Sequence, residues 1–462
     1  MARSEETLGE NDNIQDGRNV ENPKERPLMD RALPSIRSPW MAKERKMWTK
    51  MFVTFCVLLV AIVMGILSIY WGADHSLQFN LPVFTVAVID FDGGEVGPYL
   101  QHMAASERTA NPKKTLGYVS EPGSKYNFSN EQALQALKHE DFWFGIVVQS
   151  NATTAMNDAY NNGNTSYDPT GSVHLIYEEG RNALAINLLA YPAILKFMDD
   201  FVLKFAKQKQ SSLRTANAGN AAALERQTET PIPVSFAVFN VATYTPSTAE
   251  AATEIGTIYL IIISFVSVLM FGTLSEAMMG KVPLVRYYIY RMTVLPVLYF
   301  FLSLLYLALS CAWKIDFGKF FGPSGYVIYW MLSWCAMTAF GLVVENVHNL
   351  IGQPFTPVFF VFWVISNVAT GFYPVELLSN FYRWGLAWPL RHDLIGAKAI
   401  IFGTKNLLGL NFGVLLAWVG ISLALQPFTI WMQMRKMKKQ ADAHKREVLE
   451  RVYKKVQEQE YE

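Results

Sequence analysis

Long apolar stretches constrain this sequence more than any other feature. Each is dominated by apolar side chains, and they cover residues 51–71, 255–274, 292–312, 325–344, 355–372 and 412–432. A helix of about 20 such residues crosses the hydrocarbon core of a bilayer. The sequence therefore predicts an integral membrane protein, α-helical, with about six transmembrane helices.

The overall composition agrees with this class of protein. Only 17% of the 462 residues are charged, whereas soluble domains carry about 25%. The formal net charge of +1 argues against nucleic acid as a partner, because nucleic-acid-binding proteins are usually strongly basic.

The distribution of basic residues predicts the orientation. Four basic residues precede the first apolar run and four follow the last: Lys43, Arg45, Lys46, Lys50, Arg435, Lys436, Lys438 and Lys439. Cytoplasmic flanks are enriched in Lys and Arg, so we expect both termini to be cytoplasmic. Residues 1–50 then form an N-terminal tail, and residues 433–462 form a basic amphipathic tail suited to an anionic membrane surface or a partner helix.

One segment conflicts with that orientation. Residues 373–411 should lie outside, yet they contain Arg383, Arg391, Lys398 and Lys405. Because the segment is semi-apolar, we expect a re-entrant or interfacial helix there rather than a free loop. Residues 255–432 thus form a five-helix membrane domain with an interrupted segment near its end.

Residues 72–254 lie between the first and second spans and are predicted to form an extracytoplasmic domain. The three glycosylation sequons, at Asn127, Asn151 and Asn164, all fall in it, as expected for an exposed, translocated segment. Strand-like runs alternate with helical patterns, which predicts an α/β or α+β fold. The strands are expected at residues 83–89, 144–148 and 173–177, and the helices at 130–138 and 181–207.

Two acidic pairs in this domain are candidates for a metal site or a catalytic site. Asp90 and Asp92 precede Gly93-Gly94, but no pattern of further ligands accompanies them, so a capped turn is favoured over a metal site. Glu178 and Glu179 are adjacent on a strand and face opposite ways, so they are unsuited to a general acid and base pair. A strand-to-helix junction in which Arg181 pairs with a carboxylate is favoured instead. We expect no catalytic residue, no metal and no cofactor.

Polar residues in the membrane part provide the remaining candidates. Charges are nearly absent from the predicted spans, and no ion relay is visible. Glu345 and His348 are expected in a short cytoplasmic turn between the fourth and fifth spans. Asn367 lies inside the fifth span, and both an interhelical hydrogen bond and a substrate contact are open for it.

Several sequence stretches carry a family resemblance. They are FNLPVFTVAVIDFDGG from residue 79, YEEGRNALAINLLAYP from 177, FNVATYTPSTAEAATEIGTIYLIIISF from 239, GFYPVELLSNFYRWGLAWPLRH from 371 and FGTKNLLGLNFGVLLAW from 402. In these stretches, and in its order of spans, the chain resembles the ABC-2-type membrane proteins, and most of all the fungal nitrosoguanidine-resistance (SNG) family.

This resemblance implies a glycosylated fungal permease that exports lipids, drugs or polymers, confers toxicant resistance, and resides in the plasma membrane. The sequence contains no nucleotide-binding motif, so the implied energy source is a separate ATPase. Its implied docking region is either the Glu345–Asn349 turn or the cytoplasmic Lys281–Arg291 loop after the second span. Membrane lipids, other membrane proteins and further copies of the chain are the other expected partners.

Two other functions were weighed against export. The first is a non-transporting scaffold or regulator of plasma-membrane lipid organisation and stress signalling, which the scarcity of polar residues in the spans favours. The second is a membrane-embedded lipid enzyme, for which Arg391, His392 and Asp393 are the candidate cluster. One cluster without convergent partners is weak support for an active site, so we do not expect an enzyme.

Overall fold

The computed structural model describes residues 37, 39–77, 79–162, 166–216 and 232–460. The chain divides into two compact units, Met1–Leu59 and Val60–Glu462. The first contains a short turn, Pro39–Met41, and most of helix α1 (Ala42–Ala61). The remaining elements lie in the second unit.

Five helices within the described residues are long and apolar enough to cross a membrane. In the first, α1 continues through a π-helical turn, Ile62–Ile66, into α2 (Leu67–Leu77). The other four contain α9 (Glu254–Met278), α10 (Leu284–Ala312), α12 (Ser324–Ile351) and α15 (Leu408–Glu460). The protein is therefore a multi-pass membrane protein.

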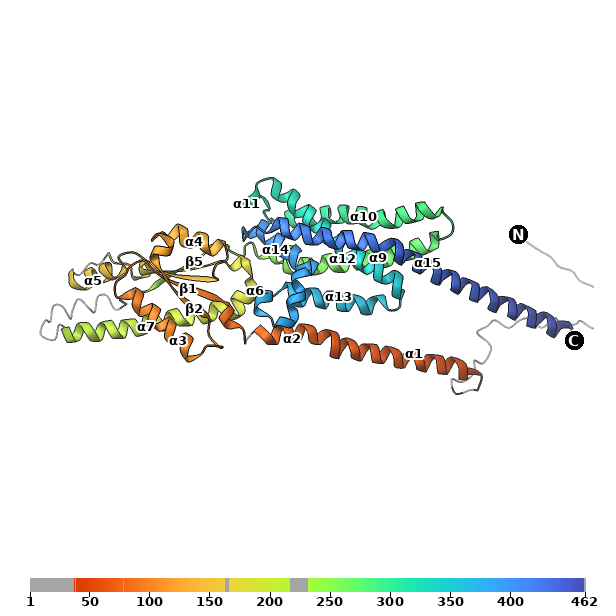
Figure 1. Cartoon of the computed structure of the whole chain (residues 1–462), viewed down its shortest axis with the longest axis horizontal. Helices are drawn as coiled ribbons and strands as arrows, with labels where there is room; N and C mark the ends of the chain where they lie inside the picture. The colour runs from red at the N-terminus through yellow and green to blue at the C-terminus, as the bar shows by residue number, and fades with distance from the viewer. Residues whose placement is uncertain (1–36, 38, 78, 163–165, 217–231, 461–462) are drawn as a thin grey trace, which may run out of the picture. The chain divides into compact units, whose positions relative to one another are not determined.

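Helix α13 (Thr356–Gly371) corresponds to the predicted fifth span but has only 16 residues. That is shorter than the roughly 17–25 residues of a transmembrane helix. Helix α12 packs along α9, α10 and α15, and α13 packs along α2 and α14 (Figure 1).

The segment between α13 and α15 is folded rather than loose. It contains two 3-10 segments, Val375–Leu377 and Asn380–Ala387, and the helix α14 (Pro389–Phe402). Most of α14 is buried against α12 and α15. It ends at Gly403, whose φ of +69° favours glycine at a helix C-terminus. A helix is therefore present in this segment, and its re-entrant or interfacial placement stays a prediction.

A five-stranded sheet domain lies within residues 80–246. Its strand order is β2-β1-β3-β4-β5, and all pairs are parallel except β3 with β4. The strands are β1 (Thr85–Asp90), β2 (Gly117–Pro122), β3 (Phe144–Val148), β4 (Val173–Tyr177) and β5 (Phe236–Asn240).

Helices cover both faces of this sheet (Figure 1). Alternate side chains of β1, β3 and β4 pack with α3 (Val96–Ala110), α5 (Ala152–Asn162) and α7 (Tyr191–Ala216) on one face. The remaining side chains pack with α4 (Asn130–Lys138) on the other face. Coverage on both faces explains why the central strands read as continuous apolar runs.

The predicted bounds of β3, β4 and α4 agree with the structure, and β1 is shifted by two residues at its start. Strands β2 and β5 and helices α3 and α5 were not predicted. Helix α7 continues past the predicted end at residue 207 to Ala216, and residues 217–231 lie outside the described residues.

The favoured interpretation of Asp90 and Asp92 is confirmed. Oδ1 of Asp90 accepts hydrogen bonds from the backbone N–H groups of Asp92 and Gly93, at 2.9 and 3.0 Å. Asp92 accepts from the backbone N–H groups of Gly94 and Thr153. Gly93 has a φ of +64°, which other residues rarely adopt. The two aspartates therefore fix the β1–α3 turn to the start of α5.

Phe201 provides a test of the sheet domain's core. Its ring is fully buried on α7 against Tyr99 and Phe205. Phe201→Ala should destabilise the domain by about 3–5 kcal/mol, because it removes a large core side chain and leaves a cavity. Leu203→Ala, two residues away and 59% exposed, is the control. The measurement is apparent melting temperature of the purified protein, and equal values for the two variants would contradict the packing.

Candidate functional site at the junction of the sheet domain and the membrane helices

Buried hydrogen bonds join the sheet domain to the membrane part. Asn182 Nδ2 donates to the carbonyl of Phe372 at 2.9 Å, and Asn80 Nδ2 donates to the carbonyl of Leu377 at 2.8 Å. The apolar core of the sheet domain also includes Tyr373 and Tyr382 from the segment after α13. A continuous core with buried polar contacts makes this a fixed junction.

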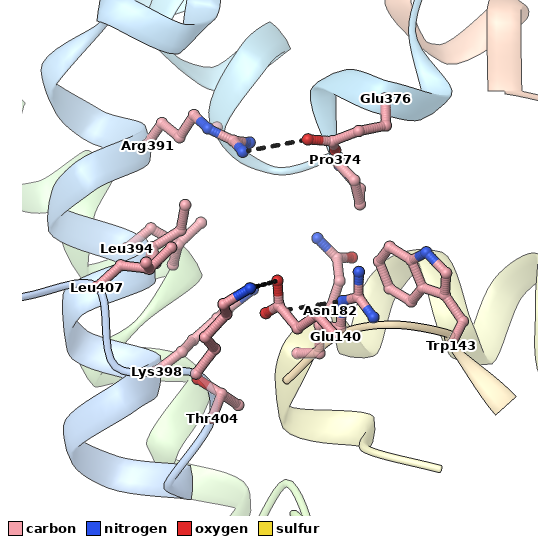
Figure 2. A pocket seen from close by; sticks show the side chains of 14 residues that line it. Glu140, Trp143, Asn182, Pro374, Glu376, Arg391, Leu394, Lys398, Thr404 and Leu407 are labelled. Atoms are coloured by element: carbon pink, nitrogen blue, oxygen red, sulfur yellow. Dashed lines mark ion pairs between the residues drawn. The ribbon is translucent and has the colours of Figure 1, made fainter. Parts of the chain in front are cut away.

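A cavity of about 100 Å³ lies at this junction, and we call it the junction cavity. Figure 2 shows Arg391, Leu394 and Lys398 of α14 on one side and residues of the sheet domain on the other. A cavity this large holds several waters, or a group the size of a phosphate. Its lining is Glu140, Trp143, Arg181, Asn182, Gly371, Pro374, Glu376, Arg391, Leu394, Ile395, Lys398, Thr404, Lys405 and Leu407.

The lining is rich in cations, with four basic and two acidic side chains. Glu140 is shared by two of them, with its carboxylate 3.8 Å from Arg181 and 3.9 Å from Lys405. These distances exceed those of a hydrogen bond. The Arg181 guanidinium also stacks 3.5 Å from the Trp143 ring, and burial lowers its pKa below the usual value.

Arg391 is the least satisfied cation of the cavity. Its guanidinium lies 3.7 Å from a carboxylate oxygen of Glu376 (Figure 2), and no hydrogen bond from it to the described residues is found. Its side chain is only 15% exposed. A buried guanidinium normally has most of its donors occupied, so Arg391 has donors available to a ligand in the cavity.

Lys398 forms the innermost ion pair. Its Nζ lies 2.8 Å from Oε1 of Glu254, at the start of α9, and both side chains are nearly buried. The other oxygen of Glu254 accepts from the hydroxyls of Thr253 and Tyr244.

Glu178 and Glu179 take different roles beside this site. Glu179 accepts hydrogen bonds from Asn187 and Asn240 at 2.8 Å. Glu178 is buried, and neither of its carboxylate oxygens has a hydrogen-bond partner within the described residues. Burial raises the pKa of Glu178 from 4.5 to about 7, although Arg181 opposes the shift. The expected strand-to-helix junction is present, and the carboxylate nearest Arg181 is Glu140.

The predicted position of Glu345 and His348 in a short turn is wrong. Both lie inside α12, near its end, and both are buried. The helix continues to Ile351 because Glu345 is neutralised within the bundle instead of being exposed to water. Glu345 pairs with Arg291, which also lies inside a helix, α10, and not in the loop where it was expected.

The Arg291 cluster joins three helices. Its guanidinium donates to Glu345 at 2.8 and 3.0 Å, and also to three other side chains: Asn349, Tyr287 and Gln433. Gln426 of α15 donates to the other oxygen of Glu345 at 2.7 Å. The expectation that the spans nearly avoid charge is therefore corrected, since an ion pair is buried with its hydrogen bonds satisfied.

His348 and Asn367 both make structural contacts. The His348 ring lies 3.0 Å, at Nδ1, from the hydroxyl of Thr356. Asn367 donates to the carbonyl of Trp363 and accepts from the backbone N–H of Leu390 at 3.1 Å, at the start of α14. The hydrogen-bond alternative for Asn367 is thus present, and none of the described cavities includes it. A substrate contact by Asn367 stays a prediction.

The cluster at Arg391, His392 and Asp393 does not converge on one space. Arg391 faces the junction cavity, whereas His392 and Asp393 are buried. The two ring nitrogens of His392 lie 3.0 Å from Asn411 Oδ1 and 2.8 Å from the carbonyl of Leu386. Nδ2 of Asn411 has no hydrogen-bond partner within the described residues. If the oxygen and nitrogen of the Asn411 amide are interchanged, Nδ2 donates to Nδ1 of His392 while Nε2 of His392 donates to the carbonyl of Leu386.

Two sequon asparagines, Asn127 and Asn151, are exposed on the sheet domain. Asn164 lies outside the described residues. Glycosylation stays a prediction for all three.

The basic residues of the junction cavity were not predicted as a site, although the sequence contains a pattern that marks them. Arg391, Lys398 and Lys405 recur every seven residues in the segment where the positive-inside rule disagreed. On α14 this spacing places Arg391 and Lys398 on one face. Their partners Glu140 and Arg181 are about 200 residues distant in sequence and had no such signal.

The Arg291 cluster predicts a large stability effect. Arg291→Gln should destabilise the protein by about 3–5 kcal/mol, because it leaves Glu345 buried without its charge partner. Arg286→Gln, on the exposed side of the same helix, should change stability by less than about 0.5 kcal/mol. The yield of monodisperse protein and its apparent melting temperature measure this. A tolerated Arg291→Gln would contradict it.

The raised pKa of Glu178 predicts a pH dependence. The native state retains a proton that the unfolded state has lost between about pH 4.5 and pH 7, so stability should fall as pH rises through this interval. Glu178→Gln should flatten the dependence and raise the apparent melting temperature at pH 8. Scans of both proteins from pH 5 to pH 8 check this, and parallel curves would refute it.

Comparisons with known proteins agree with a membrane protein. The chain is 26% identical over 442 residues to a Saccharomyces cerevisiae protein named "Uncharacterized endoplasmic reticulum membrane protein YJR015W", covering 88% of this chain and 84% of that protein. No solved structure matches the chain. The model of one family, described as "Protein of unknown function (DUF3533)", matches residues 55–424. The chain belongs to this family of proteins.

Proposed function

We propose that this protein is an ABC-2-like, SNG-type membrane permease that handles or exports anionic lipids and thereby confers resistance to toxicants. The observation that carries the proposal is Arg391, a nearly buried guanidinium in the junction cavity whose ion pair is long, at 3.7 Å. Guanidinium groups bind phosphate through paired, planar hydrogen bonds. Arg391 is the group that a phosphate-bearing ligand would engage.

The position of the cavity supports a lipid as the ligand. Its lining includes Gly371, the last residue of α13, and Leu407, which precedes α15. The Lys398 partner Glu254 begins α9. The ends of membrane-spanning helices lie near the lipid headgroups, and this supports a cavity at the depth of lipid phosphates.

A separate ATPase is the proposed energy source, because this sequence contains no G-x-x-x-x-G-K-[ST] motif. The turn between α9 and α10 is the proposed docking region. Lys281 in this turn is exposed, as are three residues at the start of α10: Arg286, and Leu284 and Val285 at 58% and 70%. The buried Glu345 is unsuited to docking.

The proposed location is the plasma membrane, with both termini cytoplasmic and the sheet domain glycosylated outside. The name of the yeast relative places that protein in the endoplasmic reticulum. Fluorescence imaging of a C-terminal fusion distinguishes the two compartments, and protease protection of each terminus in sealed vesicles tests the orientation.

The exposed tail of α15 favours a second function, a membrane scaffold or regulator. Val448, Leu449, Val452 and Tyr453 are between 43% and 69% exposed beyond the apolar part of the helix. An amphipathic surface of this kind binds partner helices or anionic membrane surfaces. Gentle purification with quantitative mass spectrometry separates the functions: a stoichiometric ATPase supports the permease, and signalling proteins without an ATPase support the scaffold.

Arg391→Gln tests the proposed function. Loss of a charged hydrogen bond of about 1.5–3 kcal/mol should weaken phosphatidic acid binding by roughly 10- to 100-fold. Resistance of cells to toxicants should fall with it. Arg383→Gln, at an exposed arginine in the same segment, is the matched control.

Binding is measured by native mass spectrometry of the full-length protein in phosphatidylcholine nanodiscs with added phosphatidic acid. Unchanged binding in Arg391→Gln, at normal stability, would refute the role of the cavity. Equal losses in both variants would show a general charge effect instead of recognition in the cavity.

A further inference from the structure

A second hollow adjoins the junction cavity. This lateral groove has a volume of about 650 Å³ and is more open than the cavity. Its lining is mainly apolar and aromatic, including Tyr70, Leu184, Leu188, Ile255, Phe372 and Tyr373. Leu184 and Leu188 are 37% and 59% exposed, so apolar surface in the groove is available to a ligand.

The cavity and the groove share a wall, and three contacts lie in it. At each contact one residue lines the cavity, and a residue that is bonded or ion-paired to it lines the groove. Asn182 lines the cavity and Ala183 the groove, and Gly371 lines the cavity and Phe372 the groove. Asn182 Nδ2 bonds to the carbonyl of Phe372 across these two segments.

The third contact is the ion pair between Lys398 in the cavity and Glu254 in the groove. Of the three contacts it is the one made by two side chains alone. It can therefore open by rotation of side chains, without a change in the backbone.

We propose that the junction cavity and the lateral groove together form one binding site for an anionic phospholipid, with the phosphate in the cavity and an acyl chain in the groove. The Lys398–Glu254 pair is the partition between them, and on binding Lys398 exchanges Glu254 for the lipid phosphate. This inference rests on the proposed function, and it adds the two-part substrate and the residues that divide it.

Charge and polarity support this assignment. The cavity presents four basic and two acidic side chains, a net positive lining for a phosphate. The groove presents mainly leucine, isoleucine and aromatic side chains to a hydrocarbon, with Asn187, Glu250 and Glu254 as its polar residues. Each methylene buried in an apolar groove strengthens binding by roughly three- to four-fold. A free phosphate uses only the first set of contacts, whereas a long-chain phosphatidic acid uses both.

The test uses the full-length protein in phosphatidylcholine nanodiscs, with dioleoyl phosphatidic acid and inorganic phosphate as separate probes. Leu188→Asp places a charge in the groove without touching the cavity, and Leu203→Asp, equally exposed at 59%, is its control. We expect Leu188→Asp to weaken phosphatidic acid binding at least 10-fold and to leave phosphate binding unchanged. Arg391→Gln should weaken both.

The outcomes separate this inference from the proposed function. Phosphatidic acid binding that survives Leu188→Asp but falls in Arg391→Gln would overturn the two-part site and leave headgroup recognition standing. Binding that survives both variants would overturn both. Equal losses in Leu188→Asp and Leu203→Asp would also overturn the groove, since the effect would not depend on position.

The partition is tested by exchanging its charges. The double variant Lys398→Glu with Glu254→Lys restores an ion pair but places a carboxylate in the cavity. We expect a normal melting temperature and at least a 10-fold loss of phosphatidic acid binding. Unchanged binding would reduce the pair to a structural contact. If the double variant fails to fold, Lys398→Met with Glu254→Gln, which removes both charges, is measured instead with the same expectation.

Discussion

The membrane part depends on a guanidinium that is buried among apolar helices. Arg291 is 1% exposed, and an unpaired charge at such a position is prohibitively costly. Its contacts with Glu345, Asn349 and Gln433 need three helices, α10, α12 and α15, at one relative height. The cluster therefore fixes how these helices align along their axes, which apolar contacts alone specify weakly because one leucine is much like another.

The features that could be predicted from the sequence are those marked by an uninterrupted run of apolar residues. Apolar runs gave the spans, and the continuous buried strands β3 and β4 had recognisable lengths and boundaries. The β2 strand, GYVSEP, was missed because it is at the sheet edge, where polar side chains are tolerated and the apolar pattern is lost. The β5 strand lies at the other edge and is similarly exposed.

Charges inside the bundle could not be predicted in the same way. Glu345 and Arg291 were each predicted to lie in a loop or turn at the end of a span. A single sequence does not show that these two residues, 54 apart, form an ion pair inside the bundle. The junction cavity could not be predicted for the same reason. Its basic residues from α14 are visible at their seven-residue spacing, but Glu140 and Arg181 join them only through the packing of the sheet domain on the membrane helices.

The short length of α13 has a consequence for the lipid around it. At about 1.5 Å per residue, 16 residues span only about 24 Å, against a hydrocarbon thickness of about 30 Å. The bilayer must become thinner beside α13, or other parts of the chain must fill the difference. A thinned patch next to the junction would bring the headgroups of the two leaflets closer together, and so shorten the path of any lipid that crosses the membrane beside this protein.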